Sequence, residues 1–516
     1  MTAPVLMVQG TASSVGKSMI AAGLCRILRR RGVNVAPFKA QNMSLNAAVT
    51  ADGGEIARSI AVQAAAAGVE PTVDMNPILL KPEAESRSQV IVRGRVWSTM
   101  EARAYLAGGL DLWPIVADSL DRLREAYQVV VAEGAGSPAE LNLRDRDLVN
   151  MRVARQTEAA VLLVGDVDRG GVFAQLIGTL DLLKPEERAL VRGLVVNRFR
   201  GDPTLFEDGV RILEERTGLP VLGVVPMVRD IGLAEEDSVP LDNRQFPETS
   251  GEHVLRIAVA RLPHIANFDD FDPLAREAGV ALGYAARPEQ LHGADLVIVP
   301  GSKSTIADLA WLHDCGIAKV LRGRPPRGTP VMGICGGLQM LGRAIHDPDG
   351  VESAVVTAPG LDLLPIETLF AAPKRTARVR GCLDCDRGPF AAGVGHEVDG
   401  YEIHAGRTRV LDPADSRPIL RLTARLGQVV DEPDGAVSGD GLVCGTYLHG
   451  LFENEIVRQT LLAWLAARRG WSWPPDGIAG QMDDPHDRWA DALEAAFDVP
   501  RILQLCHISP LSTPRP

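Results

Sequence analysis

The stretch Gly10–Ser18, GTASSVGKS, combines residue types that suit the binding of a phosphate chain. In loops of the form G-x-x-x-x-G-K-[ST], backbone N–H groups wrap the phosphates, the lysine reaches the outer ones, and the hydroxyl holds Mg²⁺. Five residues separate the two glycines here, one more than in the commonest form. We expect a nucleotide at this loop; the alternative is an ordinary glycine-containing loop capped by a serine. The candidate nucleotide-binding residues are Gly10, Thr11, Ser14, Gly16, Lys17 and Ser18.

A second stretch, GICGG at 333–337, places Cys335 between glycines directly after the apolar run TPVMGI. Small flanking residues permit the strained strand-to-helix turn that exposes a nucleophile above a sheet. At the start of a helix the thiolate is favoured by the dipole, and the N–H of Gly336 could stabilise an oxyanion. The alternative is a small apolar residue in a core. The flanking glycines favour the nucleophile.

A cysteine nucleophile needs a base. Of the ten histidines, His449 in LVCGTYLHG follows a strand-like run and precedes a glycine. His404 in GYEIHAGRT is the competitor. A lone histidine is often structural. The residue types alone therefore leave three possibilities open: His449 is the base, His404 is the base, or the histidine is structural.

The residues around these motifs indicate which elements must position them. From residue 4 to about residue 230, apolar runs such as VVVAE and AAVLLVG alternate with helical stretches. Apolar runs of this kind are typical of parallel strands buried on both faces, and their alternation with helices predicts a doubly wound sheet. A stretch rich in Pro, Gly, Ser and acids interrupts the rhythm before a second α/β series begins. We predict the α/β class with two doubly wound domains: an N-terminal P-loop parallel sheet (1–233), a linker (234–254), a second domain (255–458) and a C-terminal helical extension and tail (459–516).

The overall charge limits the class of protein. With 54 basic and 66 acidic residues the formal net charge is −12, which argues against nucleic-acid binding through a broad basic field. No apolar segment reaches the roughly 18 residues that a membrane span needs, and no charged leader with an apolar core opens the chain. The seven cysteines are best interpreted as reduced thiols. We expect a cytoplasmic protein that binds neither nucleic acid nor membrane, and no feature indicates an oligomeric state.

The longer phosphate loop resembles that of dethiobiotin synthetase and its relatives, which activate a carboxylate as an acyl phosphate with ATP. The likeness extends to Lys39 in APFKAQNMS and Glu133 in VVAEGAGSP, both at predicted strand ends, where open parallel sheets bind their ligands. The resemblance implies that Lys39 faces phosphate or the substrate carboxylate, and that Glu133 joins Ser18 around Mg²⁺. It also implies that Asn197, in VVNRFRGD, reads the adenine edge.

The cysteine elbow together with GTYLHGLF resembles the class I glutamine amidotransferase domain, which has a flavodoxin-like fold. In that family the cysteine attacks the side-chain amide of L-glutamine, and the histidine activates it and then protonates the leaving ammonia. The resemblance implies these roles for Cys335 and His449. It further implies that PGSKST lines the glutamine site, where Gly301 or Ser302 offers a second oxyanion N–H beside that of Gly336.

One position departs from the usual amidotransferase pattern. Many members carry a glutamate two residues after the histidine, where this chain has Leu451. In lacking this glutamate, the chain resembles the branch of the family that contains the cobyric acid and cobyrinic acid diamide synthases. What orients His449 therefore stays open, with Glu453 as a candidate.

Further stretches resemble the cobyric acid synthase family: FKAQNMSLNA, NPILLKP, RLPHIANFDDFDPL, VPGSKST and GYEIHAGRT. The resemblance implies a glutamine-hydrolysing amide ligase that uses ATP, Mg²⁺ and L-glutamine on a corrinoid. Its expected reaction amidates the b, d, e and g side-chain carboxylates of adenosylcobyrinic acid a,c-diamide to give adenosylcobyric acid. The nearest alternative is a cobyrinic acid a,c-diamide synthase. An alternative of a different class is a regulatory P-loop ATPase with a glutaminase-like binding domain.

Overall fold

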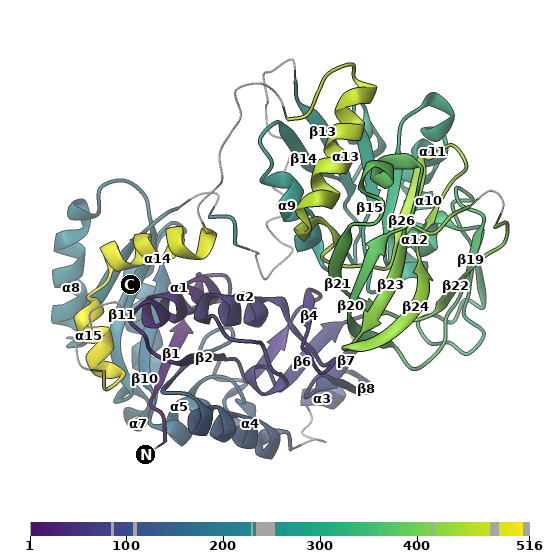
Figure 1. The fold of residues 1–516 in the computed structure, drawn as a ribbon. Coiled ribbons are helices and arrows are strands. Elements are labelled where there is room, and N and C mark those ends of the chain that lie inside the picture. The colour runs from purple at the N-terminus through teal and green to yellow at the C-terminus, as the bar shows by residue number, and fades with distance from the viewer. Residues whose placement is uncertain are drawn as a thin grey trace.

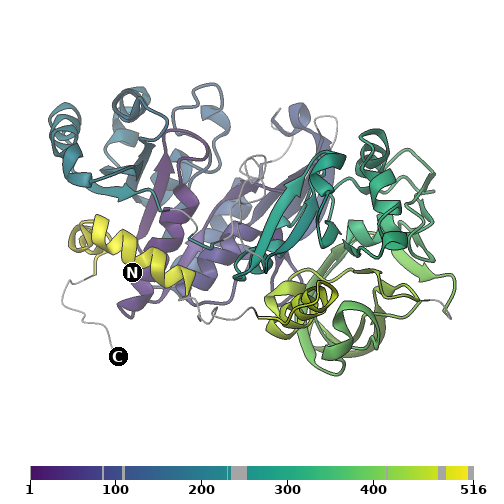
Figure 2. The ribbon, with the colours of Figure 1, turned by 90° about the horizontal axis from the view of Figure 1, so that it is seen from above.

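The computed structural model describes residues 2–83, 87–106, 111–228, 231–233, 253–413, 416–474 and 484–508. Within these ranges the chain forms two α/β units, which lie side by side in Figures 1 and 2. The predicted linker, 234–254, lies outside the described residues except for its last two positions, and the tail 509–516 lies outside them as well.

The N-terminal unit is built on a six-stranded sheet with the order β12-β11-β10-β1-β9-β2, in which all neighbours are parallel. Strand β1 is buried over its whole length because its alternate side chains enter two separate cores, one on each face. The strands are β1 (Val5–Gly10), β2 (Val35–Phe38), β9 (Val129–Glu133), β10 (Ala160–Asp166), β11 (Val191–Phe199) and β12 (Val221–Pro226). The helices of this part are α1 (Lys17–Arg30), α2 (Arg58–Ala67), α3 (Ala102–Leu106), α4 (Trp113–Ala126), α5 (Met151–Thr157), α6 (Val172–Leu182), α7 (Pro185–Arg188) and α8 (Glu207–Thr217).

The C-terminal unit has a second six-stranded sheet, with the order β14-β13-β15-β16-β26-β25. All pairs in it are parallel except the edge pair of β25 and β26. Its strands are β13 (Leu255–Ala260), β14 (Val280–Ala285), β15 (Leu296–Val299), β16 (Val331–Ile334), β25 (Ala436–Val437) and β26 (Val443–Thr446). Its helices are α9 (Asp272–Ala275), α10 (Thr305–Asp314), α11 (Ile317–Arg322), α12 (Gly336–Leu341) and α13 (Glu455–Arg468). The predicted α/β class with two parallel sheets is confirmed.

Smaller, mainly antiparallel sheets that the sequence did not predict extend both units. The N-terminal unit adds β3 (Gln41–Met43), β6 (Ile78–Pro82), β7 (Arg87–Val92) and β8 (Arg95–Glu101), as well as the pair β4 (Ala47–Val49) and β5 (Glu55–Ala57). The C-terminal unit adds β20 (Arg375–Leu383), β21 (Glu397–His404), β23 (Leu420–Arg425) and β24 (Gln428–Asp434), and a smaller sheet of β17 (Ala344–His346), β18 (Thr357–Pro359), β19 (Ile366–Leu369) and β22 (Arg407–Val410). Strands such as β20 and β23 carry polar residues at alternate positions, so they lack the continuous apolar runs that revealed the parallel strands.

The predicted C-terminal extension divides between the two units. Helix α13 packs into the core of the second sheet, whereas α14 (Pro485–Ala496) and α15 (Val499–Leu505) return to the first unit and lie beside α1 (Figure 1). Gly23 of α1 makes this return possible, because a Cβ there would lie 2.1 Å from Cδ1 of Leu493. Arg26 of α1 also pairs with Asp487 of α14 at 2.6 Å.

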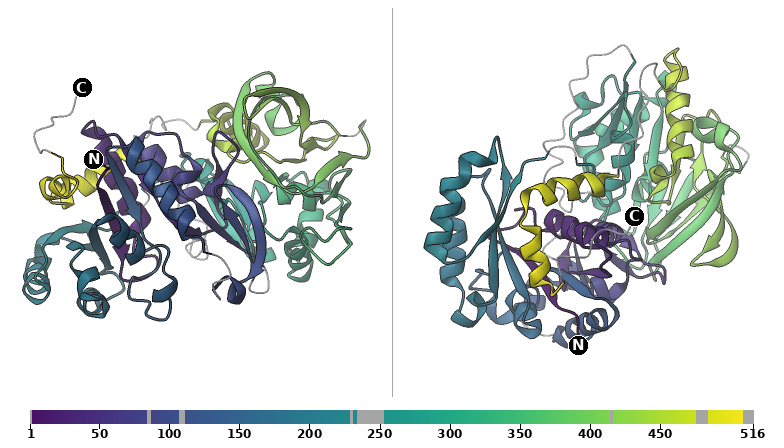
Figure 3. Two further views of the ribbon diagram at one scale, coloured as in Figure 1. Left: turned by 90° about the horizontal axis from the view of Figure 1, so that it is seen from below. Right: turned by 60° about the vertical axis from the view of Figure 1, so that its left-hand side comes forward.

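The two units meet where β4 and β5 approach β20 and β21 (Figures 1 and 3). A small apolar cluster spans this junction and joins Ala47, Val49 and Leu79 of the first unit to Tyr401 and Ile403 of the second. Among the helices that the described ranges contain, none has both the length and the apolar character needed to cross a membrane.

Candidate active sites

The phosphate loop joins the end of β1 to the start of α1. Gly16 has a φ of 98°, and a Cβ there would lie 2.2 Å from Nδ2 of Asn197, so this turn requires glycine. The ammonium of Lys17 donates to the carbonyl oxygens of Ala12 at 2.9 Å and of Gly136 at 3.1 Å. Lys17 therefore lies between the phosphate loop and the loop that follows β9, where it can meet phosphates held by the loop's N–H groups.

The other predicted residues of this loop shape its course. Gly10 ends β1, and a Cβ at that position would lie 2.5 Å from the side chain of Val15. Thr11 donates its backbone N–H to Val164 and its hydroxyl to Gln175. Ser14 occupies the left-handed region with a φ of 57°. The loop thus has the tight turns that bring backbone N–H groups to one side.

The side chain of Asn197 lies against the phosphate loop. The side chain is buried at 4% exposure, and its Nδ2 donates to the carbonyl oxygen of Val15 at 2.8 Å. Nδ2 carries a second hydrogen and Oδ1 can accept, so this contact does not conflict with one to a base. The expectation that Asn197 reads the adenine edge stays a prediction.

Glu133 is the centre of a buried polar cluster at the carboxyl end of β9. Its Oε1 accepts from Ser18 Oγ at 2.7 Å and from Lys39 Nζ at 2.9 Å, and its Oε2 accepts from Gln63 Nε2 at 2.6 Å. The structure thus brings together Ser18, which was predicted from the phosphate loop, and Lys39 and Glu133, which were predicted from two strand ends. Gln63 was missed because it lies inside α2, away from any motif.

The same cluster offers oxygen atoms to Mg²⁺, which prefers oxygen ligands in an octahedron of about 2.0–2.1 Å bonds. Two ligands at a right angle in such an octahedron lie about 3 Å apart. The hydroxyl of Ser18 and the carboxylate of Glu133 lie 2.7 Å apart, and the buried carbonyl oxygen Oε1 of Gln63 has no hydrogen-bond partner among the described residues. The oxygens present therefore fit Mg²⁺.

The second site begins at the elbow between β16 and α12. Cys335 has φ 52° and ψ −109°, a strained conformation for a non-glycine residue. The turn needs its glycines: a Cβ at Gly337 would lie 1.9 Å from Val299 O, and one at Gly333 would lie 2.6 Å from Gly337 C. A Cβ at Gly336 would lie 3.0 Å from the backbone N of Ser302, so the predicted oxyanion groups are neighbours.

His449 faces this thiol from the loop after β26. Its ring lies beside Gly301, where an added Cβ would be 3.2 Å from His449 Cε1 and 3.8 Å from Cys335 Cβ. On its other side, Nδ1 lies 2.6 Å from Oδ2 of Asp270, whose Oδ1 accepts from the N–H of Gly450 at 2.8 Å. An Nδ1–H bound to the carboxylate leaves Nε2 for the thiol.

The charge state of His449 follows from these neighbours. Burial alone would lower its pKa, but the negative charges of Asp270 and of Cys335 raise the pKa to about 10. With a pKa of about 10, the imidazole is cationic at neutral pH. The site thus holds an attacking group and a proton for a leaving group.

Asp270 is the functional residue that the sequence did not single out. The candidate proposed for its place, Glu453, is wrong: its side chain is 52% exposed and its Oε1 lies 3.6 Å from Nη2 of Arg58. Asp270 lies 179 positions before His449, so no local spacing connects the two. The available signal was the acidic run within FDDFDPL, where three carboxylates stand among apolar residues.

His404, the other candidate base, has a different setting. Its ring is buried and stacks on Tyr447 with ring centroids 3.8 Å apart. Burial lowers its pKa, and Nε2 lies 3.6 Å from Oε1 of Glu402. The contact with Asp270 and the place beside Cys335 favour His449 over His404 as the candidate base.

Residues of the N-terminal unit hold the segment that carries Asp270. The backbone N–H of Phe268 donates to Asn46 Oδ1 at 3.3 Å, that of Ala47 donates to Asn267 Oδ1 at 2.9 Å, and Arg58 Nε lies 2.8 Å from Asp269 Oδ2. Tyr401 stacks on His449 with ring centroids 5.3 Å apart, and its hydroxyl donates to Ala47 O at 3.3 Å. Residues 46–58 of the N-terminal unit therefore contact the segment that carries Asp270 and the tyrosine that stacks on His449.

Two family models together match most of the chain. Residues 6–241 match the CobQ/CobB/MinD/ParA nucleotide binding domain, and residues 256–457 match the CobB/CobQ-like glutamine amidotransferase domain. The chain is 54% identical to the cobyric acid synthase of Roseiflexus castenholzii, over 98% of this chain and 100% of that one. The cobyric acid synthases of Chloroflexus aurantiacus and Sorangium cellulosum are 54% and 52% identical, each over 96% of this chain and 98% of theirs. Identity of this level over nearly the whole length, joined to both site motifs, shows that the chain belongs to the cobyric acid synthase family.

Proposed function

We propose that this protein amidates the b, d, e and g side-chain carboxylates of adenosylcobyrinic acid a,c-diamide, giving adenosylcobyric acid, with ATP as activator and L-glutamine as nitrogen donor. Membership of the cobyric acid synthase family supports the reaction class. The observation that carries the proposal is that one chain joins a phosphate loop to an assembled Cys335, His449 and Asp270 site.

In the C-terminal unit, the thiolate of Cys335 attacks the side-chain amide carbon of glutamine. The N–H groups of Gly336 and of Gly301 or Ser302 stabilise the oxyanion that forms. His449 donates its proton to the departing nitrogen, which leaves as ammonia, and water then hydrolyses the thioester to glutamate. Asp270 keeps the ring in the required tautomer and stabilises its positive charge.

In the N-terminal unit, the phosphate loop and Lys17 hold the phosphates of ATP while the substrate carboxylate attacks the terminal phosphorus. The bond to the bridging oxygen breaks, ADP leaves, and an acyl phosphate is formed. Lys39 reduces the repulsion between the two anions as they approach. Ser18 and Glu133 would hold Mg²⁺, which supplies charge neutralisation on the phosphates when bound. Ammonia then displaces phosphate from the acyl phosphate, and an amide remains.

Product analysis by mass spectrometry tests the proposal. Purified protein with ATP, Mg²⁺ and glutamine is given either cobyrinic acid or its a,c-diamide, and the successive acid-to-amide mass shifts are counted. We expect up to four shifts on the diamide and none at the a and c positions of cobyrinic acid. Amidation of cobyrinic acid at a and c would instead identify a cobyrinic acid a,c-diamide synthase.

A further inference from the structure

A cavity of about 1320 Å³ opens beside the phosphate loop. Its walls come from β3, the start of α4, the loop between β9 and α5, and α5 itself. The cavity reaches Ser13 of the phosphate loop and also Gly136, whose carbonyl oxygen accepts from Lys17 at 3.1 Å. A ligand in this cavity would therefore border directly on the phosphate-binding lysine.

The walls of the cavity carry apolar groups that solvent can reach. Met43 is 58% exposed and Leu143 is 40% exposed, which is unusual for large apolar side chains. Trp113 also lines the cavity, and the guanidinium of Arg152 lies 4.3 Å from the centre of its ring. These groups offer a broad surface to a flat ring system.

Cations without protein partners lie on the same walls. Arg146 and Arg155 line the cavity, and within the described part of the chain their side chains make no hydrogen bond or ion pair. Asp147 and Glu187 of the same wall accept from backbone N–H groups. Among the described residues, neither these two nor the other acids of the wall, Asp111, Glu140 and Asp145, form an ion pair with the two arginines. The two arginines are therefore available for carboxylates.

The cavity also connects with the glutaminase site through the chain. Gln41 and Met43 of its wall belong to β3, and the backbone continues within a few residues to Asn46 and Ala47, which contact the segment carrying Asp270.

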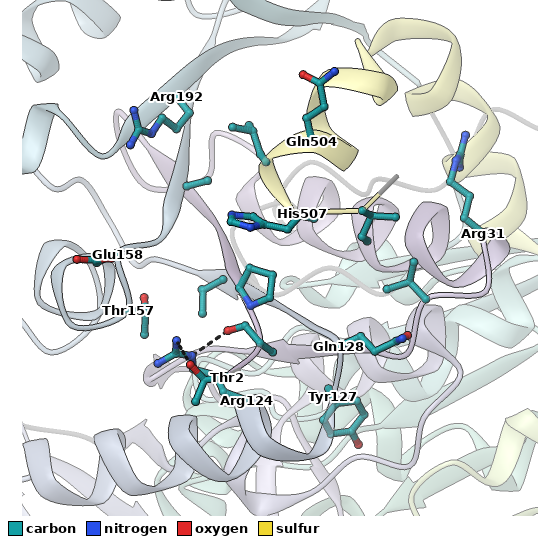
Figure 4. A pocket seen from close by; sticks show the side chains of 18 of the residues that line it. Thr2, Arg31, Arg124, Tyr127, Gln128, Thr157, Glu158, Arg192, Gln504 and His507 are labelled. Atoms are coloured by element: carbon teal, nitrogen blue, oxygen red, sulfur yellow. Dashed lines mark hydrogen bonds between the residues drawn. The ribbon is translucent and has the colours of Figure 1, made fainter. Parts of the chain in front are cut away.

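A cavity of about 1060 Å³ elsewhere provides a contrast (Figure 4). It is lined by Thr2, Arg31, Arg192 and, from the C-terminal end of the described chain, His507. These residues lie at the amino ends of the strands of the first sheet, whereas open parallel sheets bind their ligands at the carboxyl ends. The cavity of Figure 4 therefore serves as a control surface.

We propose that the cavity beside the phosphate loop binds the corrinoid, an inference that rests on the proposed function. The corrin ring lies against Met43 and Trp113, and carboxylates on its rim pair with Arg146 and Arg155. The arm to be activated extends past Gly136 toward Lys17. The volume of the cavity exceeds the roughly 300–1,000 Å³ typical of pockets for drug-sized ligands, as a corrinoid requires.

Equilibrium dialysis of cobyrinic acid a,c-diamide, followed by corrin absorbance, tests the assignment on the full-length protein. Arg155→Gln and Met43→Glu alter exposed wall residues, and Arg192→Gln in the other cavity is the matched control. We expect the first two variants to bind the corrinoid at least tenfold more weakly and the control to bind it like the parent protein. ATP affinity and cooperative unfolding, measured on the same preparations, identify any variant that has failed to fold.

The outcomes separate the two proposals. If the parent protein binds and amidates the diamide but Arg155→Gln and Met43→Glu keep the parent affinity, the cavity is not the corrinoid site and the proposed function stands. A loss confined to Arg192→Gln would overturn the assignment as well and transfer it to the cavity of Figure 4. If the parent protein neither binds nor amidates any corrinoid, the proposed function itself fails.

Discussion

Nδ1 of His449 lies 2.6 Å from Oδ2 of Asp270, a carboxylate from a segment 179 positions earlier in the chain. Class I amidotransferases that place a glutamate two residues after the histidine obtain this contact locally. In this chain Leu451 occupies that position and is buried, so the contact is made across the fold instead. The catalytic pair thus depends on a segment that the N-terminal unit helps to hold.

The first prediction concerns Asp270→Asn. The neutral amide can no longer stabilise the imidazolium, so the pKa of His449 should fall from about 10, and glutamine-dependent amidation should drop by about 100-fold or more. Amidation supported by ammonium salts should persist, because it bypasses the thiol. The measurements are the NMR titration of His449 and rates with both nitrogen donors. Equal losses with both donors would contradict the role given to Asp270.

The second prediction separates the two half-reactions at Cys335. Replacing Cys335 by Ala removes the nucleophile, so glutamine-supported amidation should disappear while ammonium-supported amidation remains. Initial rates with each donor, measured at one corrinoid concentration, provide the comparison. Loss of both activities would show that the thiol is needed for more than glutamine hydrolysis.

The third prediction is the converse change at the phosphate loop. Lys17→Ala removes the ammonium that lies between Ala12 and Gly136, so ATP binding and amidation with either donor should be lost. Glutaminase activity, measured as glutamate release, should remain because its groups lie in the other unit. Amidation that survived with ammonium salts would place carboxylate activation elsewhere.

The fourth prediction tests the link between the units. Burial raises the pKa of Asp269 to about 6, and Arg58 opposes this shift from 2.8 Å away. Arg58→Ala should leave Asp269 buried without its cation and displace the adjoining Asp270. Glutaminase kcat/KM should therefore fall about tenfold, since one hydrogen bond to a charged group contributes about 1.5–3 kcal/mol.

Arg58→Lys is the matched variant for that test. It keeps a cation within reach of Asp269, so Asp270 should stay closer to its place beside His449. Part of the glutaminase rate that Arg58→Ala loses should therefore return. A purely structural role for Arg58 would lower thermal stability in Arg58→Ala without moving the pH profile of glutamine hydrolysis.

Both chemical motifs were predictable because their signals are local. The phosphate loop and the elbow each need glycines at fixed positions between a strand and a helix, and these patterns can be read over about ten residues. Asp270 could not be found in this way, because its partner lies on a distant strand end. The contact of Asn197 with Val15 could not be found in this way either. It joins the end of β11 to the loop after β1, and β10 lies between these two strands in the sheet.

The sequence also did not predict where the peripheral helices and strands pack. The amphipathic pattern of α14 predicts a helix with one buried face, but it does not say that this face packs on α1, more than 450 residues earlier. The strands of the first unit at the junction, β4 and β5, have three residues each, which is too short for a periodic pattern to reveal them. One of these strands, β5, carries the buried carboxylate of Glu55.

The fifth prediction concerns Glu55, whose carboxylate lies 2.7 Å from the ammonium groups of both Lys81 and Lys374. Lys374 belongs to the C-terminal unit, so the cluster ties the units together. Burial would raise the pKa of Glu55, but the two lysines outweigh it and lower the pKa to about 2. Glu55→Gln leaves two buried ammonium groups without an anion and should cost about 3–5 kcal/mol of unfolding free energy at pH 7.

The pH dependence of the unfolding free energy lost in Glu55→Gln shows whether charge causes that loss. Because the folded pKa of Glu55 is depressed, its stabilisation is fully present above the unfolded value of about 4.3 and is lost as the pH falls toward about 2. The difference between parent and Glu55→Gln in denaturant unfolding should therefore shrink over this window. Asp399→Asn, which breaks the exposed pair with Arg380, is the control and should change stability by at most about 1 kcal/mol at either pH. A difference that stayed constant down to pH 2 would mean that packing, rather than charge, joins the units at Glu55.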